Sequence, residues 1–284
     1  MQPNSTAPIA LNDRAIVMVA GPQAESFLQA LITTDLASLA AGEAKPGALL
    51  TPQGKILFDF VVSRIDDAIR LETGVEQADA LMKRLTMYKL RAPVTLTLTS
   101  PAQVTIHFHG EGGGDRDMRF EKAGHDVFRV YGETDASASA EPYDKLRIDN
   151  GIAVSGSDFA LQDAFPHDVL MDKNGALSFK KGCYVGQEVV SRMQHRGTAR
   201  RRIVLVRAQA PLPETGTALT AGGKSIGTLG SVVGQSGLAI VRIDRAGEAM
   251  AATTSILAGD VPVTVTLPGW TGLEFPAQAD EASA

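Results

Sequence analysis

The residues best suited to chemistry lie in one short stretch around the only cysteine of the chain, Cys183. Residues 179–188 read Phe-Lys-Lys-Gly-Cys-Tyr-Val-Gly-Gln-Glu. The two glycines flank the cysteine at a spacing that allows a tight, exposed bend, and the two lysines before it favour the thiolate over the thiol. Two interpretations of Cys183 follow from the residue types: a reactive or metal-ligating sulfur, or a small buried apolar side chain.

The segment from Lys180 to Arg202 is basic within an acidic chain. It carries seven Lys and Arg residues against one carboxylate, Glu188, whereas the whole chain has a formal net charge of −5. Such a segment indicates either an anionic ligand, which Arg and Lys bind well, or a solvated surface. The negative net charge argues against a protein built mainly to wrap nucleic acid.

Other candidate residues are weaker. Asp59 lies in an otherwise apolar predicted strand, where an ionisable group needs a partner or a function. His107 and His109 alternate along another predicted strand, but no cluster of Cys or His accompanies them, which favours surface histidines over a metal site. The single cysteine excludes an internal disulfide and any iron-sulfur cluster held wholly by the thiolates of this chain.

The hydrophobic patterns predict an α+β N-terminal part and an all-β C-terminal part. Strands are expected at 15–19, 48–50, 55–63, 94–98 and 104–108, and helices at 27–32, 78–85 and 143–150. Short alternating segments with many glycines from residue 203 onward predict a small barrel ending near Trp270. The predicted parts are an N-terminal α+β unit at 1–135, a second α+β part at 136–202, the barrel at 203–270 and a disordered tail at 271–284.

The location predicted from these features is the cytoplasm. No apolar run approaches the ~18 residues that a membrane span needs. The first residues show neither a secretory nor a mitochondrial targeting pattern. Loops are expected at 110–114 and 135–140, which are rich in Gly, Ala and Ser.

Residues 181–188 closely resemble the signature of the YgfZ family and of its mitochondrial relatives in iron-sulfur cluster assembly. These proteins belong to the glycine-cleavage T-protein (aminomethyltransferase) superfamily. The resemblance covers roughly residues 11–270, and further segments occur in the order of the family. They are Asn12–Arg14, Gly21–Asp35, Pro52–Lys55, Tyr88–Arg91, Arg147–Gly151 and Gly237–Ile240.

The resemblance implies a three-part ring: two interleaved ferredoxin-like units with antiparallel sheets, and a small C-terminal β-barrel. It also implies tetrahydrofolate or a derivative as cofactor, and iron-sulfur carrier or assembly proteins as partners. Cys183 would then be a functional thiolate in cluster assembly or repair, and a partner would share the cluster because one thiolate cannot hold it alone. The site residues implied are Lys181, Cys183, Gln187, Glu188 and Arg192, with Asp59, Arg91 and Asp149 as further members.

Two other functions stay open at this stage. One is an aminomethyltransferase that transfers a one-carbon unit to tetrahydrofolate. True aminomethyltransferases of the superfamily carry two adjacent acids after the glycine turn, whereas Phe58 takes the first of these positions here and only Asp59 remains. The other is an RNA-associated or tRNA-modification factor, which the basic residues between Arg196 and Arg202 suggest.

Overall fold

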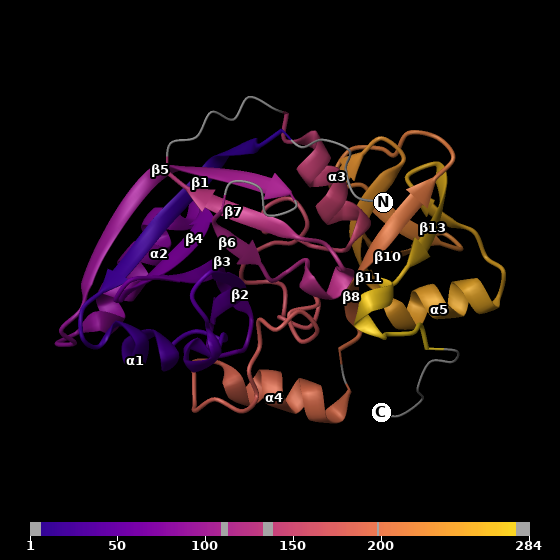
Figure 1. The fold of residues 1–284 in the computed structure, drawn as a ribbon. Helices are drawn as coiled ribbons and strands as arrows, with labels where there is room; N and C mark the ends of the chain where they lie inside the picture. The colour runs from indigo at the N-terminus through magenta and orange to yellow at the C-terminus, as the bar shows by residue number, and fades with distance from the viewer. Residues whose placement is uncertain (1–6, 109–112, 133–138, 198, 277–284) are drawn as a thin grey trace. The chain divides into compact units, whose positions relative to one another are not determined.

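The chain divides into two compact units. The first comprises Met1–Tyr143 and Met171–Ser191, and the second comprises Asp144–Leu170 and Arg192–Ala284. The computed structural model describes residues 7–108, 113–132, 139–197 and 199–276 (Figure 1). No helix of these residues is long and apolar enough to cross a membrane.

The first unit is built on a closed sheet with the strand order β1-β4-β3-β2-β6-β7-β5. All neighbouring pairs are antiparallel except β2 and β6, which run parallel. The strands are β1 (Ile9–Ala20), β2 (Glu43–Leu50), β3 (Ile56–Ile65), β4 (Ala68–Gly74), β5 (Thr95–Phe108), β6 (Asp115–Asp117) and β7 (Val127–Tyr131). The helical segments are α1 (Ala24–Gln29), the short 3₁₀ turns η1 (Leu36–Ser38) and η2 (Glu121–Ala123), and α2 (Val75–Lys89).

One apolar core joins the helices of this unit to its sheet. The long helix α2 packs against β1, β4 and β5 (Figure 1). Leu81 and Leu85 of α2 and Leu28 of α1 are fully buried there, among strand residues such as Val62 and Leu71. Each such side chain stabilises the fold by about 1.5–3 kcal/mol. The helical spacing in the sequence therefore identified the correct buried face of α2.

The first unit also contains a network of buried ion pairs, here called the buried charge cluster. Arg129 donates to both Glu72 and Asp117, and Arg14 donates to Glu72 at 2.8 Å. Burial alone would raise the pKa of Glu72, but the guanidinium groups of Arg129 and Arg14 outweigh it and lower that pKa to about 2. The members of the cluster are Arg14, Glu72, Asp117, Arg119, Arg129 and Tyr143.

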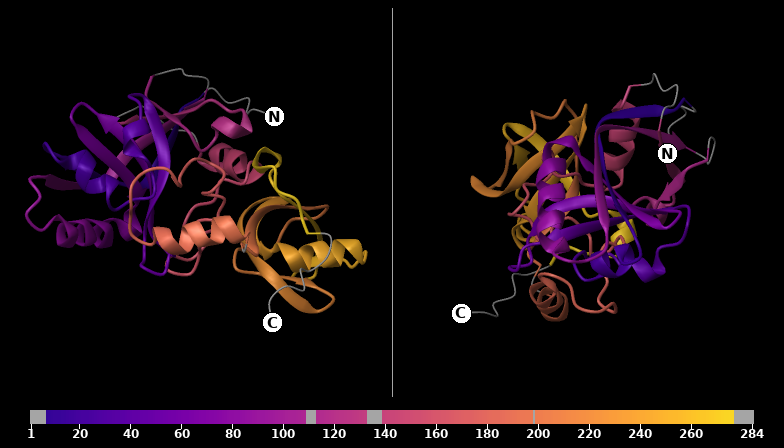
Figure 2. Two further views of the ribbon diagram at one scale, coloured as in Figure 1. Left: turned by 90° about the horizontal axis from the view of Figure 1, so that it is seen from below. Right: turned by 90° about the vertical axis from the view of Figure 1, so that its left-hand side faces the viewer.

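The second unit contains a closed six-strand barrel with the order β10-β11-β8-β13-β12-β9. Helix α5 lies beside the barrel (Figures 1 and 2). Its residues Ile243, Ala246 and Ala249 belong to the barrel core. The strands are β8 (Arg201–Ala208), β9 (Ala218–Ala221), β10 (Lys224–Val233), β11 (Ser236–Arg242), β12 (Ile256–Ala258) and β13 (Val261–Thr266). The remaining segments of this unit are α5 (Ile243–Ala251) and η3 (Gly269–Thr271). Two helices, α3 (Glu141–Asp149) and α4 (Gln187–Arg196), belong partly to each unit.

The α+β class and the C-terminal barrel are confirmed. The two alternating segments at 94–98 and 104–108 form the single strand β5. The sequence patterns did not predict β4, β6, β7, β9, β12, α4 or α5. The predicted domain boundaries stay predictions. The loops at 110–114 and 135–140, the tail from 271 and His109 fall wholly or partly outside the described residues.

Candidate functional site

The cysteine loop, residues 178–186, is fixed to the first unit at its N-terminal side by Lys181. The ammonium Nζ donates to the carbonyl oxygens of Ile32 and Thr34, both at 2.7 Å. The backbone N–H of Ser178 adds a hydrogen bond to the carbonyl of Thr33 at 3.0 Å. Burial lowers the pKa of Lys181 to about 8, with Asp35 opposing the shift. The lysine is thus a buried clip and not a solvent-facing cation.

A contact between two glycine turns fixes the other side of the loop. Gly186 has φ +79°, and a Cβ there would lie 2.5 Å from the carbonyl oxygen of Thr51. Gly54 has φ +78°, and its Cβ would lie 2.9 Å from the Cβ of Val189. Only glycine combines this backbone conformation with such a close approach. The two motifs, residues 52–55 and 181–188, therefore require glycine because they pack against each other.

Cys183 is exposed between these two anchors, with a free thiol. Its neighbour Tyr184 is 6% exposed, and burial raises the pKa of its phenol to about 12. The ammonium of Lys181 lies 5.4 Å from the centre of the Tyr184 ring. Buried residues on both sides hold the backbone in place while the thiol faces solvent. This answers the two interpretations of the cysteine: it is not a core residue.

Helix α4 follows the loop directly and carries three predicted site residues. Gln187 is its first residue and is partly buried, whereas Glu188 and Arg192 are exposed. Glu188 and Arg192 are four positions apart, so they share one face of the helix. Glu188 in the first turn and Arg196 in the last turn complement the helix dipole. The helix therefore presents a carboxylate and a guanidinium side by side.

The three further members of the predicted site lie elsewhere. Asp59 is partly buried on β3 and accepts a hydrogen bond from Nε2 of Gln77 at 2.9 Å. Arg91 is exposed just beyond α2. Asp149 belongs to the second unit, where it accepts from Lys145 and, at 2.7 Å, from Arg207. The cysteine loop and the start of α4 thus bring together Lys181, Cys183, Gln187 and Glu188, and Arg192 follows on the same helix.

Part of the basic segment is neutralised within the protein. Arg201 pairs with Asp163 at 3.0 Å and Asp168 at 2.8 Å, and Arg202 donates to the carbonyl of His167. With Lys181, at least three of the seven cations are used internally, which the sequence did not reveal. Among the described residues no group of three or more His, Cys, Asp or Glu could hold a metal ion, and His107 belongs to no such group.

Comparisons with known proteins give the relationship of the chain. Residues 200–273 match the family model described as "CAF17, C-terminal beta-barrel domain". The chain is 28% identical to the mitochondrial iron-sulfur cluster assembly factor IBA57 of Mus musculus, over 92% of this chain and 84% of that protein. It is 29% identical to the corresponding Homo sapiens protein, over 81% and 76% of the two chains. The chain is a homologue of these assembly factors.

A solved structure identifies the fold. The glycine cleavage system aminomethyltransferase T of Bartonella henselae matches with a TM-score of 0.72 at 18% identity, over 95% of this chain and 86% of that one. The chain therefore has the T-protein fold, as the sequence resemblance implied. At this identity the match concerns the fold alone.

The predicted cytoplasmic location is wrong on this comparison. The relatives of Pyricularia oryzae, mouse and human are named as mitochondrial proteins. The prediction relied on composition and on the lack of a visible targeting pattern. Import machinery reads an address from a targeting segment, so the composition of a folded region does not determine the compartment.

Proposed function

We propose that this chain supports iron-sulfur cluster assembly as a tetrahydrofolate-binding factor, with Cys183 as its functional thiolate. The observation that carries the proposal is the exposed thiol of Cys183, which stands between two fixed points, the Lys181 clip and the Gly54–Gly186 contact. Rigid anchoring of an exposed, polarisable ligand atom suits transfer of a metal cluster between proteins. The names of the relatives support the same role.

The cluster would be cargo shared with a partner protein. A cluster needs several ligands, and one thiolate cannot hold it. Among the described residues, Cys183 belongs to no group of three or more His, Cys, Asp or Glu that could hold a metal ion. The remaining ligands therefore come from the partner, and the loop is the place where the two proteins would meet.

The donor set around the start of α4 fits a reduced folate. A carboxylate such as Glu188 accepts two hydrogen bonds from the amino-pyrimidine edge of a pterin, and a guanidinium beside it, such as that of Arg192, donates to the adjacent pterin carbonyl. Gln187 adds an amide that donates and accepts. The ammonium of Lys181 already donates to two carbonyls, so we assign Lys181 to positioning the loop. Asp59, Arg91 and Asp149 remain proposed members of the site.

The thiolate role is tested in cells that lack the protein. Wild type, Cys183→Ser and the control Lys180→Met are each reintroduced, and the activities of several iron-sulfur enzymes are measured. Lys180 is exposed and adjacent to the clip, so its variant tests a change in the loop that spares the thiol. We expect wild type and Lys180→Met to restore the enzymes and Cys183→Ser to fail. Full restoration by Cys183→Ser would refute the thiolate role.

The folate role is tested by anaerobic calorimetric titration with tetrahydrofolate. Loss of one charge-assisted hydrogen bond costs about 1.5–3 kcal/mol, so Glu188→Gln and Arg192→Met should each weaken binding roughly 10-fold to 100-fold. Arg196→Met is the control, because Arg196 is exposed in the last turn of the same helix. Equal affinities for all three variants and wild type would place the folate elsewhere.

The two other functions have less support. Phe58 stands at the position of the first acid of true aminomethyltransferases, and a phenyl ring has no ionisable group that could transfer a proton. It is packed into the apolar core and 7% exposed. Release of ammonia from an aminomethylated carrier in the presence of tetrahydrofolate would nevertheless reveal that activity. For RNA, the internal partners of Arg201 and Arg202 reduce the available positive charge.

A further inference from the structure

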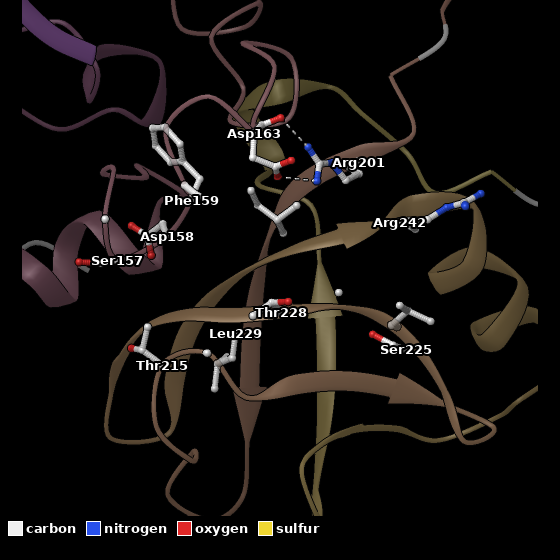
Figure 3. A pocket seen from close by; sticks show the side chains of 16 residues that line it. Ser157, Asp158, Phe159, Asp163, Arg201, Thr215, Ser225, Thr228, Leu229 and Arg242 are labelled. Atoms are coloured by element: carbon white, nitrogen blue, oxygen red, sulfur yellow. Dashed lines mark hydrogen bonds and ion pairs between the residues drawn. The ribbon is translucent and has the colours of Figure 1, made fainter. Parts of the chain in front are cut away.

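A pocket in the second unit lies apart from every residue discussed as part of the folate and cysteine site. Its volume is about 510 Å³, which is in the range of small-molecule sites. One wall is the loop of residues 156–163, and the floor is the outer face of β10, β11 and β8 (Figure 3). The outer face is recognisable because Val241 lies in the barrel core, so its neighbours Ile240 and Arg242 point outward.

Two arginines lie at one end of this pocket. Arg201 on β8 and Arg242 on β11 are direct partners across the two strands. Like charges placed opposite each other destabilise a sheet. Burial would lower the pKa of Arg201, but Asp168 and Asp163 outweigh it and raise that pKa. Asp244 raises the pKa of Arg242. Both guanidinium groups therefore stay charged. Three carboxylates offset this charge, because Asp163 and Asp168 pair with Arg201 and Asp244 pairs with Arg242. The pocket can therefore bind an anion only where a ligand replaces one of these pairs.

The ion pairs of Arg201 differ in how easily a ligand could replace them. The side chain of Asp168 is 3% exposed, and it accepts from Nε at 3.2 Å and Nη2 at 2.8 Å. The side chain of Asp163 is 58% exposed and accepts from Nη1 at 3.0 Å. The buried pair therefore aims the guanidinium, whereas the exposed pair contributes only ~0–1 kcal/mol and exchanges readily. Figure 3 shows Asp163 and Arg201 together at the upper edge of the pocket.

Arg242 keeps donor capacity as well. Its Nε and Nη2 donate to Asp244, while Nη1 has no hydrogen-bond acceptor among the described residues. Figure 3 shows the Arg242 side chain directed away from Arg201, so an anion in the pocket would take the Nη1 donor of Arg201 alone.

The rest of the lining suits an apolar body. Phe159 and Ile240 offer apolar surface beside the arginines, and Ser157 and Thr228 add hydroxyl groups. Gly216 leaves its part of the rim open, since a Cβ there would meet no atom within 4 Å. The combination is a cationic end joined to a mixed apolar cleft.

We propose that this pocket binds a small organic anion, a carboxylate or phosphate on an aromatic or aliphatic body. The anion would displace Asp163 from Arg201 and pair with Arg201, while the body lies over Thr228 and Ile240. The inference does not depend on the proposed folate or thiolate function, because the two sites share no residue.

The test uses phenyl phosphate as the probe in amide NMR titrations of the full chain. We expect saturable shifts at residues 225–229 and 156–160, and at least 10-fold weaker binding of inorganic phosphate and of benzyl alcohol, which lack the body and the anion respectively. Arg201→Gln should weaken phenyl phosphate binding roughly 10-fold.

A matched pair of variants tests the position of the ligand. Thr228→Trp fills the pocket from an exposed strand position, and Thr266→Trp makes the same change at an exposed position of β13 outside it. Binding should be lost in the first and unchanged in the second. The proposal is overturned if phenyl phosphate does not saturate, if its shifts map elsewhere, if Thr228→Trp binds as wild type, or if benzyl alcohol binds equally well.

Discussion

Replacement of Lys181 by methionine separates the positioning role of this lysine from a role in ligand binding. Methionine is similar in length and unbranched, but it leaves the carbonyls of Ile32 and Thr34 without their 2.7 Å donor. Each hydrogen bond from a charged donor contributes about 1.5–3 kcal/mol. Burial of the ammonium offsets part of this, as its lowered pKa of about 8 shows, so the free energy of unfolding should fall by about 2 kcal/mol.

Urea denaturation followed by circular dichroism measures this loss. Lys180→Met is the matched control, because Lys180 is exposed and the same atoms are removed one residue away. Its unfolding free energy should stay within about 0.5 kcal/mol of wild type. Equal stabilities of Lys181→Met and Lys180→Met would refute the clip.

The pH dependence gives a second, independent readout. In the folded protein Lys181 has a pKa of about 8, below the ordinary value of 10.5. Below pH 8 the lysine is charged in both states and the cost of burying it is fully present. Between pH 8 and 10.5 the unfolded state binds more protons, so stability rises with pH. The advantage of wild type over Lys181→Met should therefore grow in this range. Tyr184, with its pKa of about 12, affects both proteins alike.

Three further changes test other parts of the fold. Glu72→Gln should lower the free energy of unfolding at pH 7 by roughly 3 kcal/mol. Because the folded pKa of Glu72 is about 2 and its ordinary value is 4.5, the ionised carboxylate stabilises the fold fully above pH 4.5 and this stabilisation is lost as the pH falls to 2. Urea titrations should therefore show the difference from wild type closing between pH 4.5 and 2. Gly186→Ala should cost about 2–4 kcal/mol in the same assay, while Gly182→Ala, whose Cβ would meet nothing within 4 Å, should be near neutral. Leu90 has φ +46°, which strains a side chain with a Cβ, and it is 86% exposed. Leu90→Gly should therefore raise the free energy of unfolding by about 1 kcal/mol and with it the melting temperature. A melting temperature below that of wild type would contradict the strain.

The sequence was most informative where a motif requires a particular backbone. The glycines of residues 52–55 and 181–188 pointed to tight turns, and the structure shows that these turns pack together. The helical spacing of Leu81 and Leu85 identified a buried face because apolar burial follows the period of the helix. Neither pattern could show that the two turns touch, since contacts between distant segments leave no periodic signal.

The strands of the first unit that escaped prediction are those with charges on the inner side of the sheet. β4 carries Glu72, β6 carries Asp117 and β7 carries Arg129, all buried within the charge cluster. A strand whose inward residues are ionised reads as solvent-exposed or as a loop, because the alternation rule assumes an apolar interior. Helix α5 was missed for another reason: its buried face contains small residues, including Gly247, which approach the chain closely but resemble a turn in the sequence.

The same limit applies to the candidate sites, because the number of charged residues in a segment is not the number available to a ligand. Lys181 and Arg202 donate to backbone carbonyls, but a count of positive residues in the sequence includes them among the cations that could bind an anion. What distinguishes a binding cation is a donor left over, or a partner that solvent can replace. The exposed pair of Arg201 with Asp163 meets the second condition. Binding of phenyl phosphate by Arg201, in a segment first noted for its total charge, would show that donor geometry decides which cations act.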